Sequence, residues 1–495
     1  DDMLSIQTFD AKGTVHLLDG SLSIQRDEHS EFIIKRGRKQ ERVSLNFTGR
    51  VLPYATLPIP TELQRPLKFG VKPLGTRSGF DLSGPSTGFI IWVEGKVCVY
   101  DGPAGTRYLL ESQGIACDDI AMVVLSHCHE DHMGAFVELV LSGSRPKVYT
   151  TEPIYRSALI KLSTYFRMPE SKVAEFIDYH RIEPGKPFDN LGATFELFYT
   201  VHAIPAVGIK VRYSGSGNTR ELVISGDTLH HEGLKDLLEE GVITDDVYQE
   251  MLHMVPQSAK DDTLYFCDVG ESIIHGHPSD WLDNPNQVLY YHCPNSEHTR
   301  SFGRELATPG KTIELIENAA MVRVSPPRLI RALDFLSVED PHWLNRFIDE
   351  SDVSEFNTDQ LLVRSGDKLD GSLFVLTTGL LEATSNDKDE YTLIRPSEFY
   401  GYLEYVDAEG GSTATIRALC PSEVMQIPLK LLSEYIDEYD LDELLPIIKS
   451  MRPLIDSIPL LKNLKTGQRN LLARQASKVS YAKGAVILDK NSPQE

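Results

Sequence analysis

Short apolar and polar stretches alternate through the first part of the chain, up to about residue 66. Alternation with a period of two places successive side chains on opposite faces of an extended strand. Residues 1–66 are therefore predicted to form β-hairpins, with a proline-containing connector at 53–66. The stretches that carry this pattern are TVHLLDG, SLSIQ, EFIIKRG and RVSLNF.

The pattern changes over residues 67–325, where apolar strands are followed by segments with helical periodicity. Strands and helices in this order are typical of a layered domain that combines the two. One apolar run, AMVVLSH, has the character of a buried strand. Further strands are expected at ATFELFYTVH, GIKVRY, ELVISGD and QVLYYH.

Residues 326–450 open with a helical pattern, continue with short strands separated by turn residues, and close with a second helix. A small β-barrel flanked by helices is the architecture that this order predicts. Residues 455–495 begin the same pattern again and stop before a barrel could close. We therefore expect either that the natural protein continues or that this chain is a fragment.

Composition narrows the classes of function. The chain has 495 residues, enough for two to four domains, and a formal net charge of −23. Such acidity disfavours polynucleotide partners. A local basic cluster is formed by Lys35, Arg36, Arg38, Lys39 and Arg42, for which we expect a solvated hairpin face. No run reaches the roughly 20 apolar residues that span a bilayer, and six scattered cysteines indicate no disulfide framework. These features predict a cytoplasmic protein without a membrane segment.

The stretch HCHEDH, His127 to His132, follows the buried strand AMVVLSH directly. Three histidines and acids in six residues would repel one another and be poorly solvated without a cation. His202, Asp227 and His292 also come at the ends of expected strands, where a sheet presents ligands on a rigid edge. The chain is therefore predicted to hold metal ions at this edge.

These residues resemble the metallo-β-lactamase superfamily, whose fold is an αβ/βα sandwich, over residues 67–325. The resemblance implies one metal at His127, His129 and His202 and a second at Asp131, His132 and His292. Asp227, in SGDT, would bridge them. Asp101, in YDGP, would support the site from behind the ligands. For His230, His231, His275 and His298 we expect surface or structural positions, although His298 is close enough to compete with His292.

Two divalent cations can activate water, polarise a substrate oxygen and neutralise developing charge, which equips such a site for hydrolysis. The nitrogen and carboxylate ligands suit zinc, with manganese or iron as alternatives. A redox diiron role in this superfamily usually requires a glutamate where this chain has His129. The histidine favours hydrolysis.

Within the superfamily, VISGDT, LYFCDVGES and HGHPSD resemble the branch of transfer-RNA 3′ processing nucleases and class II cyclic-nucleotide phosphodiesterases. The resemblance implies that Asp268 and His277 assist protonation of the leaving group, and that Asp131 is catalytic as well as a ligand. The alternative for His277 is that it caps the helix beginning near Pro278.

The C-terminal region carries Gly366 and Asp367 in RSGD, Gly379 in FVLTTGLLEA, Gly401 and the run TATIRA. With these positions, residues 333–438 resemble the cyclic-nucleotide-binding domain family, in which a cassette holds the ribose and the cyclic phosphate. Two cassette positions depart from the family pattern: Tyr402 stands in place of a glutamate, and Ser412 in place of an arginine. Shifted substitutes are Glu404 and Arg417. A structural or dimerising barrel is the alternative to a sensor. The cassette positions are Gly401, Glu404, Ser412, Thr413 and Arg417.

The leading hypothesis is a dinuclear metal-dependent phosphodiesterase acting on a small cyclic nucleotide, with a C-terminal domain that binds a cyclic-nucleotide effector or supports a homodimer. The alternatives are a nuclease of the transfer-RNA processing type, a hydrolase of thioesters or other non-phosphate esters, and a non-enzymatic assembly protein with a vestigial metal domain. The fusion to the barrel favours the phosphodiesterase hypothesis, but only by analogy.

Overall fold

The computed structural model describes residues 7–485, apart from short gaps within that range. The gaps are 11, 18–19, 27–30, 45–59, 61–63, 65, 82–83, 216, 259–261, 272–273, 294–295, 317–328, 331, 339, 386–390, 403–404, 406–408, 459–460, 462–463, 465 and 483–484. Two compact units divide the chain, residues 1–53 and residues 54–495. Among the described helices, none combines the length and apolar character that crossing a bilayer requires.

The first unit is an antiparallel meander of four strands, in which each strand pairs with the next one along the chain. The hairpins expected from the period-two pattern are present here. The strands are β1 (Thr14–Leu17), β2 (Leu22–Arg26), β3 (Glu31–Arg36) and β4 (Lys39–Ser44).

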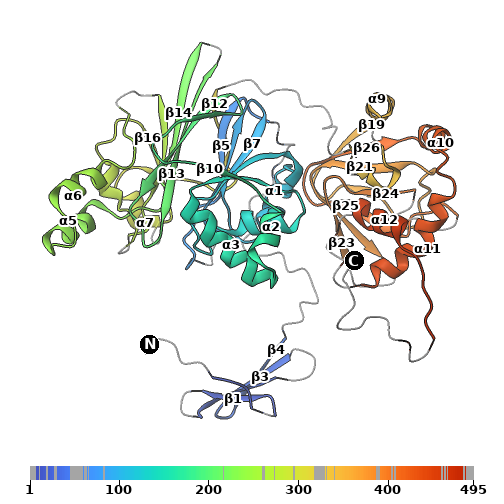
Figure 1. The fold of residues 1–495 in the computed structure, drawn as a ribbon, viewed down its shortest axis with the longest axis horizontal. Coiled ribbons are helices and arrows are strands. Elements are labelled where there is room, and N and C mark those ends of the chain that lie inside the picture. Colours follow the sequence, from blue (N-terminus) through green and yellow to red (C-terminus); the bar gives the residue numbers. More distant parts are fainter. Residues whose placement is uncertain are drawn as a thin grey trace. The chain divides into compact units, whose positions relative to one another are not determined.

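The second unit begins with two mixed seven-stranded sheets (Figure 1). In spatial order the first sheet contains β10 (Asp178–Arg181), β9 (Lys147–Thr150), β8 (Ile120–Val124), β7 (Lys96–Asp101), β6 (Gly88–Val93), β5 (Phe69–Gly75) and β18 (Ile313–Ile316). The second contains β11 (Phe188–Asn190), β12 (Ala193–Thr200), β13 (Ala206–Gly215), β14 (Asn218–Ile224), β15 (Thr263–Asp268), β16 (Gln287–Tyr291) and β17 (Glu305–Leu306).

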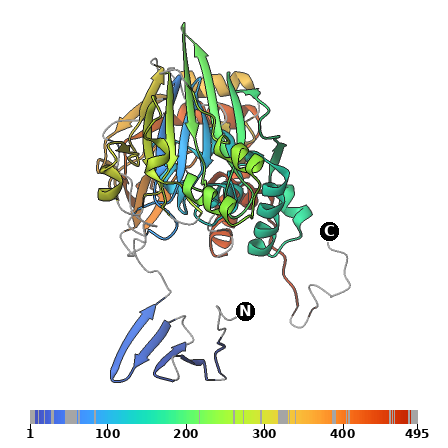
Figure 2. The ribbon, with the colours of Figure 1, turned by 90° about the vertical axis from the view of Figure 1, so that its left-hand side faces the viewer.

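Aromatic side chains join the inner faces of the two sheets. Phe89 on β6 packs edge-on against Phe266 on β15 and Tyr291 on β16, with ring centroids 4.9 and 5.6 Å apart. Phe69 on β5 meets Tyr213 on β13 at 5.4 Å. In Figure 2, turned by 90°, the green and yellow strands of the second sheet lie in front of the blue strands of the first. The two sheets therefore share one buried core.

Helices accompany each sheet, as the predicted αβ/βα sandwich requires. With the first sheet are α1 (Thr106–Ser112), α2 (Gly134–Leu141), α3 (Glu152–Phe166) and α4 (Glu170–Ala174). In the second half are α5 (His231–Glu239), α6 (Asp245–Leu252) and α7 (Ser296–Arg300) (Figure 1). Short 3₁₀ helices are η1 (Cys117–Asp119) and η2 (Pro278–Trp281). The predicted fold class is confirmed in this region.

A barrel of two four-stranded sheets follows, flanked by helices as predicted. Its sheets are β19 (Asp352–Phe356), β26 (Ser422–Ile427), β21 (Leu373–Thr378) and β24 (Phe399–Gly401), and β20 (Leu361–Val363), β25 (Ala414–Ala418), β22 (Leu381–Ser385) and β23 (Tyr391–Ile394). The flanking helices are η3 (Asp334–Leu336), α9 (Pro341–Asp349), α10 (Leu429–Glu438), α11 (Leu444–Asp456) and α12 (Thr466–Gln475).

Helix α12 comes from the segment in which a second barrel unit was expected to begin. Its Ala473 is fully buried in the same apolar cluster as Phe335 and Trp343 of the first barrel. The strand expected after this helix falls on residues 486–495, outside the described residues. Helix α12 therefore packs against the helical core of the first barrel.

The aromatic contact between the sheets gives a stability prediction. Phe89→Ala removes a fully buried ring and should lower the free energy of unfolding by about 3–5 kcal/mol, because a cavity remains where the ring packed. Chemical denaturation followed by circular dichroism measures this. The control is Tyr199→Ala, on β12 with 48% of its side chain exposed, for which we expect a change of about 0.5 kcal/mol or less. Equal effects of both substitutions would contradict the assigned core.

Candidate metal centre

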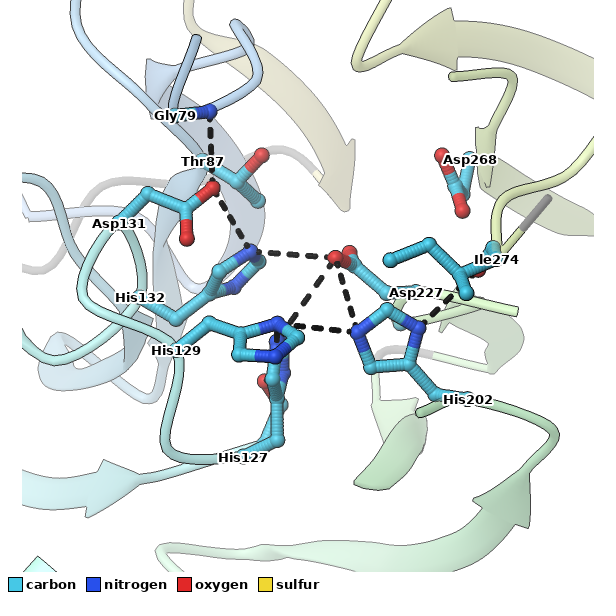
Figure 3. Close-up of polar contacts among 12 residues, drawn as sticks. Gly79, Thr87, His127, His129, Asp131, His132, His202, Asp227, Asp268 and Ile274 are labelled. Carbon is cyan, nitrogen blue, oxygen red and sulfur yellow. Dashed lines mark hydrogen bonds and ion pairs between the residues drawn. The ribbon is translucent and has the colours of Figure 1, made fainter. Parts of the chain in front are cut away.

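The histidines and acids singled out in the sequence come from strand ends of both sheets. The loop after β8 carries His127, and His202 follows β12. Asp227 comes shortly after β14, and His292 directly after β16 with a left-handed φ of 64°. The structure brings all of these side chains together, along with His129, Asp131 and His132. Figure 3 labels each of them except His292.

Three imidazoles converge at the first half of the site. Nδ1 of His129 lies 3.1 Å from Nε2 of His127 and 3.0 Å from Nε2 of His202. Burial lowers the pKa of each of these histidines, well below the usual value for His127. Neutral imidazoles with nitrogens this close repel one another through their lone pairs unless a proton or a cation lies between them. This arrangement fits a metal ion bound by nitrogen.

The second half contains Asp131, His132 and His292. Oδ2 of Asp131 lies 3.6 Å from Nε2 of His132 and 3.7 Å from Nε2 of His292. The backbone N–H of Gly79 donates to the same Asp131 oxygen at 2.9 Å (Figure 3). The carboxylate is thereby held toward the two imidazoles.

Asp227 lies between the two halves. Its Oδ2 is 3.8 Å from Nε2 of His127, 3.3 Å from Nε2 of His132 and 3.9 Å from Nε2 of His202. Although burial opposes ionisation, His132 and His292 hold the pKa of this carboxyl well below its usual value. One ionised oxygen therefore faces ligands of both sets, the position that a bridging ligand requires.

Hydrogen bonds behind the ligands orient three of the histidine rings. Nδ1 of His132 lies 2.8 Å from Asp101, which also accepts hydrogen bonds from Ser126. Nδ1 of His202 lies 3.0 Å from the Ile274 carbonyl, and Nδ1 of His127 lies 2.8 Å from the Ser126 hydroxyl. In all three rings Nε2 is left to face the centre, as in histidines that bind metals.

Several buried polar atoms in the centre support the fit to cations. Nε2 of His132, Nε2 of His292 and Oδ1 of Asp227 have no hydrogen-bond partner among the described residues. Burial opposes the charged form of His132, but Asp227, Asp101 and Asp131 outweigh it and raise its pKa well above the usual value. The carboxylates thus demand positive charge here, from a protonated imidazole or from a cation. The donor set fits two divalent metal ions.

Of the two expected proton donors, Asp268 lies at the metal centre and His277 does not. Asp268, the last residue of β15, lies against the centre, with Oδ1 3.3 Å from Nδ1 of His292. The ring beside Asp268 belongs to His275, whose Nδ1 is 3.0 Å from Oδ2 of Asp268 and 3.7 Å from Asp227. The surface or structural position expected for His275 is therefore corrected, because the turn after β15 brings it to the metal centre.

His277 lies away from these groups. Its Nδ1 accepts a hydrogen bond from the backbone N–H of Ser279, so it caps η2, and its ring is near Glu271 and His298. This is the capping geometry that the sequence left open. Only Gly276 separates the two histidines of HGH, and no sequence signal shows which one faces the centre. Only the packing of that segment separates them.

The barrel cassette has few groups for an anionic ligand. Gly401 ends β24 with a φ of 77°, the backbone N–H of Thr413 donates to the Tyr405 carbonyl, and the Ser412 hydroxyl donates to the Ala414 carbonyl. Arg417 forms a 2.7 Å hydrogen bond with Glu382. Glu404 falls outside the described residues. Between the sheets is a cavity of about 200 Å³ lined partly by Phe374 and Tyr400, small beside the roughly 300–1,000 Å³ of most ligand pockets.

Two parts of the chain match known protein families. Residues 69–257 match the family described as anti-Pycsar protein Apyc1, and residues 353–439 match the cyclic nucleotide-binding domain.

Individual relatives match over about half of the chain. A cAMP/cGMP-dependent 3′,5′-cAMP/cGMP phosphodiesterase B of Dictyostelium discoideum is 27% identical over 262 residues, covering 52% of this chain and 23% of that protein. A cGMP-dependent 3′,5′-cGMP phosphodiesterase A of the same organism is 26% identical over 255 residues, covering 49% of this chain and 29% of that protein. The match thus spans under a third of either relative.

Among solved structures, the metallo-β-lactamase fold protein YhfI of Bacillus subtilis covers 50% of this chain and 99% of its own, with 14% identity and a TM-score of 0.37. The order of strands in the two sheets gives the architecture of the first domain. Residues 69–316 form an αβ/βα sandwich, and the region that matches the cyclic nucleotide-binding domain, residues 353–439, follows it in the same chain.

Proposed function

We propose that this protein is a dinuclear metal-dependent phosphodiesterase that hydrolyses a 3′,5′-cyclic nucleotide. The observation that carries the proposal is the convergence of seven histidine and aspartate side chains on one buried centre, with Asp227 between the two sets. Similarity to two cyclic-nucleotide phosphodiesterases supports the choice of substrate. The net charge of −23 favours a small phosphodiester over a polynucleotide.

One metal would be held by His127, His129 and His202, and the other by Asp131, His132 and His292, with Asp227 shared. Two divalent cations here would supply Lewis-acid charge and lower the pKa of water to near neutrality. Zinc suits these ligands, with manganese or iron as alternatives.

The chain's own residues orient the reaction. Asp101 and the Ile274 carbonyl fix the rings of His132 and His202, so the ligand geometry needs little rearrangement. Water adds to phosphorus and the bond to one ribose oxygen breaks, which leaves a nucleoside monophosphate. That departing oxygen needs a proton, and His275, held by Asp268, is the side chain placed to donate it.

The first test removes the shared carboxylate. Asp227→Ala should abolish hydrolysis of cyclic AMP and cyclic GMP and reduce bound metal from about two ions per chain, as measured by chromatography of the nucleoside monophosphate product and by elemental analysis. Asp283→Asn, an exposed acid of the same domain, is the matched control and should change neither quantity. Cleavage of short RNA without any cleavage of cyclic nucleotides would overturn the proposed substrate.

The second test separates the two histidines of HGH. His275→Ala should lower kcat for cyclic nucleotides by about 10²–10⁴-fold, because a general acid contributes on this order. The loss should be far smaller for bis(p-nitrophenyl) phosphate, since p-nitrophenolate leaves without a proton. His277→Ala is the control, and its kcat should stay near that of the unmodified protein. The reverse pattern would assign the proton donor to His277.

The barrel gives a third test, on effector binding. Position 412 holds a serine in place of the family's arginine, and Arg417 is bound to Glu382, so neither described position offers a free guanidinium to a cyclic phosphate. Ser412→Arg should strengthen cyclic-nucleotide binding by about tenfold or more, because a charged hydrogen bond contributes about 1.5–3 kcal/mol. Calorimetric titration in the Asp227→Ala background measures this without turnover. An unchanged affinity would show that the cassette cannot hold a cyclic phosphate.

A further inference from the structure

One aromatic side chain next to the metal centre is almost completely exposed to solvent. Phe80 is 99% exposed, whereas the next most exposed large apolar side chain among the described residues is Val242 at 65%. A fully exposed ring gains nothing from the hydrophobic effect in the free protein. Large aromatic groups that stay exposed at a binding site are suited to contact a partner.

The backbone next to Phe80 is fixed to the metal ligands. The Gly79 N–H donates to Oδ2 of Asp131 at 2.9 Å (Figure 3), and the His292 N–H donates to the Thr76 carbonyl at 2.7 Å. A Cβ atom at Gly79 would lie only 2.8 Å from the Asp131 carboxyl carbon. The segment therefore touches ligands at two points, and its approach to Asp131 requires glycine.

The turn that presents Phe80 is held by its own polar contacts. Arg77 and Asp81 form an ion pair at 3.0 Å, and the Asp81 N–H donates to the Ser78 carbonyl at 3.1 Å. Consecutive Cα atoms lie about 3.8 Å apart. Phe80 directly follows Gly79, whose N–H contacts the expected metal ligand Asp131, so its side chain begins close to that ligand. An aromatic ring is thus positioned at the border of the centre where a phosphodiester would bind.

We infer that Phe80 stacks on the nucleobase of a nucleotide whose phosphate binds at the metal centre, an inference that rests on the proposed function. A nucleobase is flat and has a π-face, and aromatic side chains bind such faces by stacking with little dependence on sequence. The ligands recognise the phosphate, which every phosphodiester has. Phe80 gives the site its preference for a phosphodiester that carries a base.

The experiment compares substrates with and without a base. For Phe80→Ala, KM for cyclic AMP and cyclic GMP should rise about tenfold, the order expected from loss of stacking. For bis(p-nitrophenyl) phosphate, kcat/KM should change by no more than about twofold. Phe80→Trp should keep the KM of the unmodified protein, because tryptophan also stacks. Phe176→Ala, an exposed phenylalanine after α4, should have no effect.

Inhibition gives a readout that does not need turnover of the nucleotide. The inhibition constant of cyclic AMP against bis(p-nitrophenyl) phosphate hydrolysis should also rise about tenfold in Phe80→Ala. If this rise occurs but cyclic nucleotides are not cleaved, the proposed function fails while the stacking role stands. An unchanged inhibition constant, or equal losses for both substrate types, overturns the inference. So does a change from dimer to monomer in Phe80→Ala by size-exclusion chromatography, which would make Phe80 a contact between two copies.

Discussion

A buried carboxylate surrounded by imidazoles is the constraint on which the rest of the metal domain depends. Asp227 is 1% exposed and ionised, with nitrogens of four histidines within 4 Å of its Oδ2. Burying such a charge is costly unless it is paired. The site therefore exists only where positive charge can sit between Asp227 and the rings. Two divalent cations would meet this requirement and would leave the imidazoles neutral, the form in which they bind metal.

The sandwich fold can hold this charged cluster in position because aromatic packing joins its two sheets. Phe89 packs against Phe266 and Tyr291. Phe266 lies on β15, which ends in Asp268, and Tyr291 is the last residue of β16, which leads directly into His292. Strands fixed at their centres hold their ends in place. Ligand side chains on such ends are positioned more precisely than on free loops. The chemistry at the edge thus depends on apolar contacts in the middle.

The barrel shows the opposite relation between fold and site. Its apolar core is complete, with Phe335, Trp343 and Ala473 buried together, and residues 353–439 match a cyclic nucleotide-binding domain. Its cassette nevertheless has a serine at the position where the family has an arginine, and Arg417 is held by Glu382. A fold is maintained by packing, whereas recognition depends on a few charged side chains. Packing therefore maintains the barrel whether or not its cassette holds a ligand.

The sequence by itself determined the layered metal domain, the barrel after it, and the strand-end residues from His127 to His292, because apolar periodicity and the HCHEDH spacing are local properties. Tertiary structure decided the remainder. Which histidine of HGH faces Asp268 depends on how the turn after β15 packs, and α12 joins the existing barrel because its Ala473 finds an apolar cluster there. The residues next to Phe80 in the sequence likewise do not reveal that its side chain is exposed. Burial depends on what surrounds a residue in space and not on its neighbours along the chain.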